Sequence, residues 1–282
     1  MIKKAVIAAA GRGTRFLPIT KAYPKELLPI ANKPIIHYLI EELIAAGINR
    51  VAVVHRWDND LVPNYFRKDA GLQKFLKKNG KEDLLAELNA HRRALKELTF
   101  IPQPLHFRYG TGSPLLAAKN FIGGDDFVYV YGDDLVLEEK SGTFLKSLID
   151  AFEEEEAAAV IGAQKVKWVE VQNYGTIEFK KRRGRLAQVV KVCERSSREL
   201  APSNLVQFGR FVLSSKIVDA VSVLRPKGKT ELMFPDAVNL IAKKGKVFCA
   251  PIKGGRWLTT GDPLSWHRAN VAFMNKPRLT HK

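Results

Sequence analysis

A glycine-rich loop near the start of the chain carries the residues best suited to bind phosphate. The stretch Gly11-Arg12-Gly13-Thr14-Arg15 follows a short apolar run, and Lys25 comes shortly after it. Glycine lets backbone N–H groups approach phosphate oxygens closely. Arg15 and Lys25 would add fixed positive charge against a triphosphate. These residue types predict a loop that binds a polyphosphate.

The loop matches neither of two widespread phosphate-binding fingerprints. It is not a Walker A loop because no Gly-Lys-Ser/Thr follows it. Phe16 stands where a dinucleotide-binding fingerprint has its third glycine. A tight turn without a ligand is the alternative for a glycine-rich segment taken alone.

A pair of carboxylates follows the strongest apolar run of the chain. Phe127-Val128-Tyr129-Val130-Tyr131 reads as a central strand, and Gly132-Asp133-Asp134 comes directly after it. A carboxylate at the C-terminal end of a strand suits a Mg²⁺ ion that bridges phosphates. A capping or turn role for both aspartates is the alternative.

The elements that must position these groups follow a strand, loop, helix, strand order. Residues 4–10 form a short apolar run, and residues 34–46 have helical spacing closed by Gly47. Residues 50–54 form a second apolar run. This order is typical of a βαβ unit and predicts a parallel sheet.

The remaining chain predicts two additions to one domain that spans residues 1–282. Residues 58–98 are polar with helical patterns, so we expect a helical insertion there. Residues 166–205 contain shorter strands and turns, which favours a small antiparallel β region, with a hairpin turn at the basic stretch 180–185. The predicted fold is α/β, a Rossmann-like, mostly parallel mixed sheet flanked by helices.

Composition narrows the class of protein. The 282 residues carry a net charge of +17, which attracts phosphorylated substrates and nucleic acid. Nucleic-acid binding is the less favoured interpretation because no aromatic-rich RNP sequence or zinc-ligand spacing is present.

No apolar run approaches about 18 residues, so no membrane span is expected. The two cysteines, Cys193 and Cys249, form no CxxC pair, which favours a reducing, cytoplasmic location.

Longer motifs resemble one enzyme family. Residues 9–18 and 21–29 are similar to the signature of sugar-1-phosphate nucleotidylyltransferases. Residues 201–205, residues 209–213 and the helical insertion resemble the branch of that family that transfers uridylyl groups. The resemblance runs from Lys3 to about Ala272 and implies the nucleotide-diphospho-sugar transferase type of fold.

The resemblance also implies roles for individual residues, although this chain is slightly longer than the family between Gln103 and Gly110. The implied catalytic residues are Arg15, Lys25, Asp133 and Arg195. The implied nucleotide-binding residues are Ala10, Gly11, Gly13, Thr14, Gln103 and Gly110. The implied sugar-binding residues are Gly175, Glu194 and Arg195, and Asp133 is the implied Mg²⁺ ligand.

Two departures from the family pattern affect these roles. Arg195-Ser196 replaces a Lys-Pro pair, so a planar guanidinium stands in for an ammonium. Thr259 occupies the position of a second metal-binding aspartate, and a hydroxyl is a weak ligand for Mg²⁺. Either Asp133, water and phosphates hold the metal alone, or Asp134 or Asp262 substitutes, or activity is reduced.

The resemblance implies that the chain transfers a uridylyl group from UTP to glucose 1-phosphate, which gives UDP-glucose and pyrophosphate. Mg²⁺ would be the cofactor, and a homodimer or homotetramer the expected assembly. Two alternatives stay open. The chain could use another sugar phosphate or dTTP, or it could be a weakly active or non-catalytic binder of nucleotide sugars.

Overall fold

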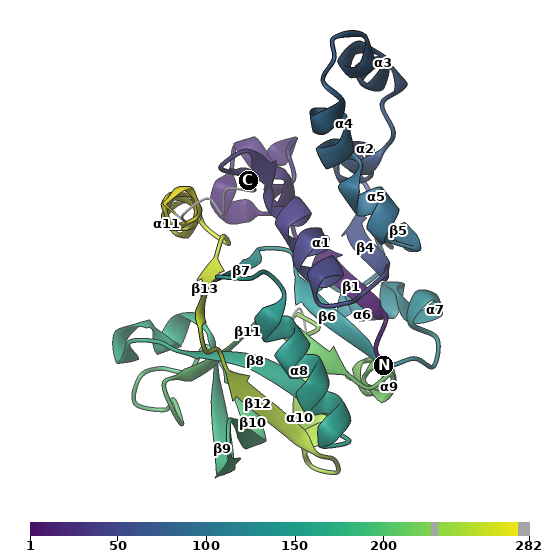
Figure 1. The fold of residues 1–282 in the computed structure, drawn as a ribbon. Coiled ribbons are helices and arrows are strands. Elements are labelled where there is room, and N and C mark those ends of the chain that lie inside the picture. The colour runs from purple at the N-terminus through teal and green to yellow at the C-terminus, as the bar shows by residue number, and fades with distance from the viewer. Residues whose placement is uncertain (227–230, 276–282) are drawn as a thin grey trace.

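A 9-stranded sheet forms the centre of the molecule, with strand order β5-β4-β1-β6-β11-β8-β12-β10-β9 (Figure 1). The computed structural model describes residues 1–226 and 231–275, except for the side chains of residues 181–183. The strands of this sheet are β1 Lys4–Ala9, β4 Arg50–Arg56, β5 Glu97–Gln103, β6 Phe127–Tyr131, β8 Ala159–Lys165, β9 Gly175–Arg183, β10 Leu186–Glu194, β11 Leu205–Leu213 and β12 Val247–Pro251.

Parallel pairing prevails in only one half of the sheet. β5, β4, β1 and β6 pair in parallel, as the strand, loop, helix, strand order predicts. β11 runs antiparallel to β6 and β8, and β10 runs antiparallel to β12 and β9. The predicted α/β fold with a mixed sheet is confirmed. Parallel pairs are fewer than predicted because β11 and β10 each lie between strands that run the opposite way.

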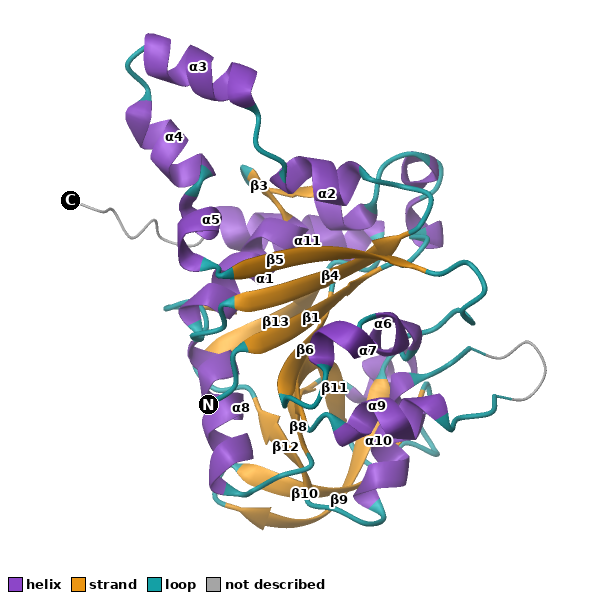
Figure 2. Cartoon of the chain, turned by 90° about the vertical axis from the view of Figure 1, so that its right-hand side faces the viewer, coloured by secondary structure: helices purple, strands orange, loops and turns teal. Residues whose placement is uncertain are grey.

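Alternating side chains place the sheet between two layers of helices (Figure 2). In β1, Ala5 and Ile7 pack in one core cluster and Val6 packs in the other, as the two-residue period of a strand requires. Helices α1 and α8 cover the first face, and α6, α7, α9 and α10 cover the second. The helices are α1 Ile35–Ala45, α6 Ser113–Ala117, α7 Lys119–Ile122, α8 Thr143–Glu154, α9 Lys216–Ser222 and α10 Phe234–Ala242.

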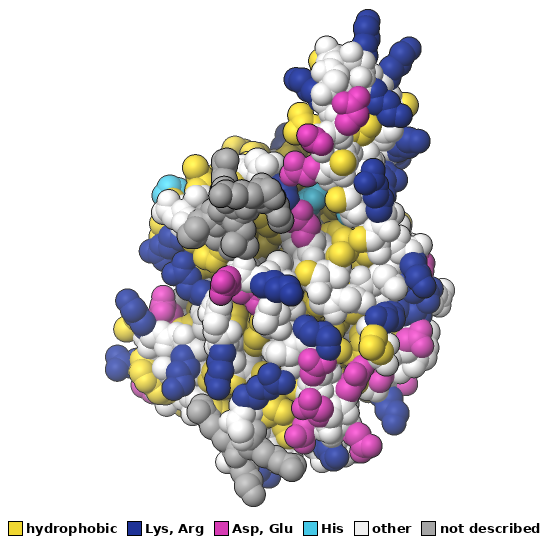
Figure 3. Space-filling model, in the orientation of Figure 1, with side chains coloured by type: hydrophobic (Ala, Val, Ile, Leu, Met, Phe, Trp, Pro, Cys, Tyr) yellow, Lys and Arg dark blue, Asp and Glu magenta, His cyan; other side chains and the backbone are white. Residues whose placement is uncertain are grey.

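Short helices between β4 and β5 form an arm that extends from the body (Figure 1). They are α2 Leu61–Phe66, α3 Ala70–Lys78, α4 Glu82–Leu88 and α5 Ala90–Ala94. At the base of the arm the Phe66 ring packs at a tilt against the Phe100 ring of β5. Lys and Arg side chains gather at its tip (Figure 3), where Lys74, Lys77 and Lys78 of α3 are exposed. β5 begins at Glu97, so the sheet resumes inside the segment predicted to be helical.

Two short ribbons and a final helix complete the molecule. β7 Asp134–Glu138 pairs with β13 Gly255–Thr259, and α11 Pro263–Met274 follows β13. The other ribbon is β2 Pro29–Ile30 with β3 Lys33–Pro34. The first ribbon matters for function because the pairing of Asp134 with Thr259 places the loop after Thr259 beside Asp133.

The predicted hairpin lies at the edge of the main sheet, where β9 and β10 pair on either side of Gly184. Its backbone at Gly184 has φ 60°, a left-handed conformation that glycine adopts without strain. Within residues 1–226 and 231–275, no helix has both the length and the apolar character to span a bilayer.

Candidate active site

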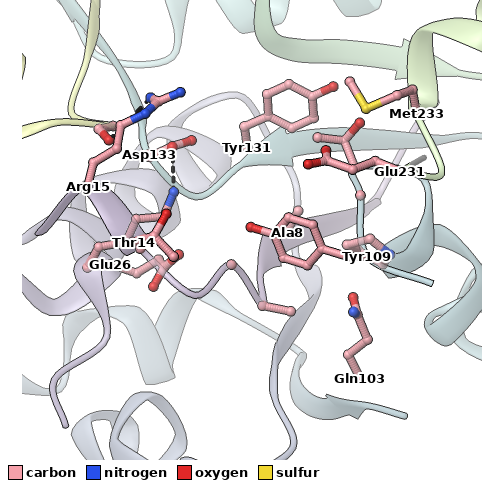
Figure 4. Close-up of a pocket in the computed structure, with 18 of the residues that line it drawn as sticks. Ala8, Thr14, Arg15, Glu26, Gln103, Tyr109, Tyr131, Asp133, Glu231 and Met233 are labelled. Atoms are coloured by element: carbon pink, nitrogen blue, oxygen red, sulfur yellow. Dashed lines mark hydrogen bonds and ion pairs between the residues drawn. The ribbon is translucent and has the colours of Figure 1, made fainter. Parts of the chain in front are cut away.

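A cavity of about 440 Å³ opens at the carboxyl ends of β1 and β6 (Figure 4). This edge is where ligands bind in open α/β sheets. The cavity brings together most of the residues singled out in the sequence, which are Ala10, Gly11, Gly13, Thr14, Arg15, Lys25, Gln103, Gly110, Asp133 and Arg195. Gly175 and Glu194 do not line it, although they lie next to Arg195 on the hairpin.

The glycine-rich loop is shaped by two close approaches. Gly13 has φ 61°, and Thr20 donates its hydroxyl hydrogen to the Gly13 carbonyl over 2.7 Å. A β-carbon at Gly13 would lie 2.9 Å from the Thr20 methyl group. A β-carbon at Gly11 would lie 3.7 Å from the Lys25 ammonium. Gly11 and Gly13 therefore line the cavity with their backbone, and Gly11 packs close to the Lys25 side chain.

Lys25 and Asp133 both line the cavity and contact each other directly. The Lys25 Nζ lies 2.5 Å from Asp133 Oδ2, and the side chains are 15% and 26% exposed (Figure 4). Burial by itself would lower the pKa of Lys25, but the Asp133 carboxylate raises it overall. Burial would raise the pKa of Asp133, but the Lys25 charge lowers it. Both groups are therefore charged at neutral pH, and each is available to a ligand of opposite charge.

The ribbon of β7 and β13 holds the Asp133 backbone in place. Thr260 donates both its backbone N–H, over 2.7 Å, and its hydroxyl, over 2.8 Å, to the Asp133 carbonyl. The loop after β13 also reaches Arg15, whose guanidinium donates to the Gly261 carbonyl over 3.4 Å. Groups distant in the chain thus meet around Asp133.

Of the three aspartates considered as metal ligands, only Asp133 lines the cavity. The Asp134 carboxylate accepts from the Gly209 N–H over 2.7 Å, and Asp262 caps α11 by accepting from the Ser265 N–H over 2.9 Å. Both are engaged elsewhere in the fold. Thr259 accepts from the Gly261 N–H over 3.3 Å. Mg²⁺ commonly binds through one or two carboxylates plus substrate phosphates, so a single Asp133 fits such an ion.

Arg195 closes the hairpin end of the cavity. Its backbone has φ 44°, a left-handed conformation that costs a non-glycine residue about 1–2 kcal/mol. Its N–H donates to the Tyr174 carbonyl over 3.2 Å, which secures this turn. Arg195 is exposed and lines the cavity.

The other end of the cavity is bounded by Gln103 and Gly110. A β-carbon at Gly110 would lie 2.4 Å from the Leu232 carbonyl, so only glycine allows this backbone contact. The Gln103 amide oxygen is buried without a hydrogen-bond partner among the described residues. An amide with unused capacity beside a phosphate loop suits a nucleobase edge.

Glu26 directly follows Lys25, and the sequence predicted no role for it. Glu26 is 1% exposed and lines the cavity, and neither carboxylate oxygen has a hydrogen-bond partner among the described residues. Burial raises the pKa of Glu26 from 4.5 to about 7. The residue could accept hydrogen bonds from hydroxyl groups of a ligand. Adjacency to Lys25 was the one signal in the sequence.

Replacing Glu26 with glutamine is expected to stabilise the protein at alkaline pH. The folded state raises this pKa, so the contribution of Glu26 to stability is greatest below pH 4.5 and is lost as pH rises through about 7. At pH 8 the variant should gain up to about 3 kcal/mol in free energy of unfolding, and at pH 5 much less. Urea denaturation at both values measures this, with Glu154→Gln on the surface as the control. Equal stability of variant and wild type at pH 8 would contradict the assignment.

Comparison with known proteins gives the family. Residues 4–276 match the family described as nucleotidyl transferase. The chain is 34% identical over 280 residues to UTP–glucose-1-phosphate uridylyltransferase 2 of Staphylococcus saprophyticus. The aligned region covers 99% of this chain and 94% of the relative.

Solved structures agree with this match. A UDP-glucose pyrophosphorylase complexed with UDP-glucose superposes with a TM-score of 0.87 at 29% identity, covering 98% of this chain and 100% of the other. A UTP-bound UGPase from Acinetobacter baumannii superposes with a TM-score of 0.87 at 30% identity, covering 99% and 96%. The fold, the cavity and these matches together show that the chain belongs to the nucleotidyl transferase family.

Proposed function

We propose that this protein transfers the uridylyl group of UTP to glucose 1-phosphate, which gives UDP-glucose and pyrophosphate. The observation that carries the proposal is the cavity in which the glycine-rich loop, Lys25 and Asp133 face one space. The relative of Staphylococcus saprophyticus bears the name of this activity, and one structural neighbour holds UTP.

In this proposal the nucleotide lies along the glycine-rich loop. Backbone N–H groups of the loop, with Ala10, Gly11, Gly13 and Thr14, hold the phosphates. Gln103 and Gly110 face the pyrimidine, because an amide and a close backbone can pair with its polar edge. dTTP differs from UTP only in its nucleoside, so the choice between the two nucleotides would be made at this end of the cavity.

The reaction needs no general base, because a phosphate oxygen of the sugar 1-phosphate is already an anion. This oxygen bonds to the α-phosphorus of UTP, and the bond from that phosphorus to the bridging oxygen of pyrophosphate breaks. Catalysis then rests on positioning and charge neutralisation. Arg15 and Lys25 stabilise the departing pyrophosphate, and Arg195 holds the incoming phosphate.

The proposed cofactor is Mg²⁺, with Asp133 as its protein ligand. When bound, the ion supplies positive charge to the phosphates and orients them. Lys25, which pairs with Asp133 and lines the cavity, is placed to bind a phosphate oxygen of the nucleotide. The chain's own contribution is thus a preformed pair of opposite charges.

Sugar recognition is assigned to the hairpin region within residues 166–205, through Gly175 and Glu194 beside Arg195. Residues 1–282 would act as one domain with 58–98 as an insertion. We further propose a cytoplasmic location and a homodimer or homotetramer.

A substrate panel tests the proposed function directly. Purified protein with Mg²⁺ is offered UTP or dTTP together with different hexose 1-phosphates, and pyrophosphate release is followed. UTP with glucose 1-phosphate should give the highest kcat/KM. Highest activity with another pair would favour the alternative substrates. Binding of UDP-glucose with no release from any pair would favour a non-catalytic binder, as Thr259 in place of a second aspartate suggests.

A further inference from the structure

Three residues from three strands meet beside the hairpin end of the cavity. Glu194 ends β10, Gln207 lies in β11 and Gly175 begins β9. The Gln207 amide nitrogen donates to Glu194 Oε1 over 2.8 Å. A β-carbon at Gly175 would lie 2.6 Å from Glu194 Oε1 and 2.8 Å from Gln207 Nε2. Any side chain larger than that of glycine would therefore break up the pair.

The fold leaves part of the Gln207 side chain unused. The residue is 6% exposed, and its amide oxygen is buried without a hydrogen-bond partner among the described residues. Buried acceptors in native proteins are nearly always paired, so an unpaired one calls for a donor from outside the fold. A ligand hydroxyl is such a donor.

The position of this pair links it to the cavity. Arg195, the residue after Glu194, lines the cavity, and so does Tyr131. β11 lies directly against Tyr131, because a β-carbon at Gly209 would be 2.4 Å from the Tyr131 β-carbon. The Glu194–Gln207 pair thus lies next to two residues that line the cavity, Arg195 and Tyr131.

We infer that Gln207 determines sugar specificity, an inference that rests on the proposed function. The amide N–H of Gln207 holds the Glu194 carboxylate in one orientation, and its amide oxygen accepts from a sugar hydroxyl. The site then selects a neutral sugar with a free hydroxyl at this position. A sugar that lacks this hydroxyl leaves the Gln207 amide oxygen unpaired. A sugar that carries a carboxylate in place of the hydroxyl would bring its negative charge against two acceptors, the Gln207 amide oxygen and the Glu194 carboxylate.

The test combines Gln207→Leu with a set of glucose 1-phosphates that each lack one hydroxyl. For wild type, one of these analogues should have a kcat/KM about tenfold or more below that of glucose 1-phosphate. The kcat/KM of the variant for glucose 1-phosphate should be lower than that of wild type by a similar factor. For that one analogue, the kcat/KM of the variant should equal that of wild type. The KM for UTP should change by less than about twofold, because the uridine end is remote.

Gln188→Leu is the control, since Gln188 is an exposed glutamine of β10, the strand that ends with Glu194. It should leave every kinetic constant unchanged. An equal loss with all analogues in the Gln207 variant, or a rise in the KM for UTP, would show a merely structural role and overturn the inference. If the leucine variant does not fold, Gln207→Met keeps the unbranched shape and carries the same measurement.

Binding supplies a readout that does not depend on turnover. Calorimetry with UDP-glucose should give a Kd about tenfold higher for Gln207→Leu than for wild type, and an unchanged Kd for the control. Equal Kd values for variant and wild type would reject the role of Gln207. Absence of pyrophosphate release by wild type would instead reject the proposed function, whatever the binding result.

Discussion

Replacing Asp133 with alanine is expected to lower the rate of pyrophosphate release by about a thousandfold or more. Asp133 is the aspartate that lines the described cavity and the proposed Mg²⁺ ligand, and it also fixes the Lys25 ammonium at 2.5 Å. Its loss removes the proposed metal ligand and frees Lys25 at the same time. Steady-state kinetics with saturating UTP and Mg²⁺ measure the effect.

Two comparisons make this experiment decisive. Asp133→Asn keeps the size of the side chain and removes its charge, so it should be nearly as inactive as the alanine variant. Asp150→Ala removes an exposed carboxylate of α8 that pairs with Lys146, and it should keep full activity. Thermal melting shows that each variant is folded. Turnover by folded Asp133→Ala near the wild-type rate would refute the proposed metal site.

Replacing Glu42 with alanine is expected to lower the free energy of unfolding by about 3–5 kcal/mol. Glu42 and Arg210 form a bidentate ion pair, with both nitrogen–oxygen distances 2.7 Å, and the Arg210 side chain is fully buried. Arg210 also donates to the Asp134 carbonyl over 2.9 Å. Without Glu42 the buried guanidinium loses the carboxylate to which it is hydrogen-bonded, and only the weaker electrostatic effect of Asp134 and Glu138 remains, which is the costly state. Urea denaturation measures the loss.

The control for this variant is a pair at the surface. Glu97→Ala removes the partner of Arg50 from an ion pair whose side chains are 43% and 35% exposed, and it should cost less than about 1 kcal/mol. A second variant, Glu42→Leu with Arg210→Met, replaces both charges and should be more stable than Glu42→Ala alone. If Glu42→Ala costs no more than the surface variant, the buried pair does not stabilise the fold as argued.

Local patterns were sufficient to predict the elements that form the first half of the sheet. The apolar run before Gly11 is β1, and residues 127–131 form β6 with the predicted bounds. These predictions succeed because burial on both faces requires continuous apolar residues, and a glycine-rich turn marks where the strand ends. Side chains at the carboxyl ends of neighbouring parallel strands must then lie together, which brought Asp133 to the loop.

Local patterns predicted the antiparallel hairpin of β9 and β10 but not the direction of β11. β11 carries apolar residues as β6 and β8 do, and nothing in its residues reports strand direction. Direction is decided by the long connections that lead into each strand and by which edge remains free for pairing.

By itself the sequence determined the chemistry available to this protein, because the charged and glycine residues of a phosphate loop are local in the chain. Only the tertiary structure decided which groups share a space. It buried the Glu26 carboxylate, paired Lys25 with Asp133, turned Asp134 and Asp262 away from the cavity, and joined Gln207 to Glu194. Contacts between distant residues depend on how whole elements pack, and that information is spread over every apolar residue between them.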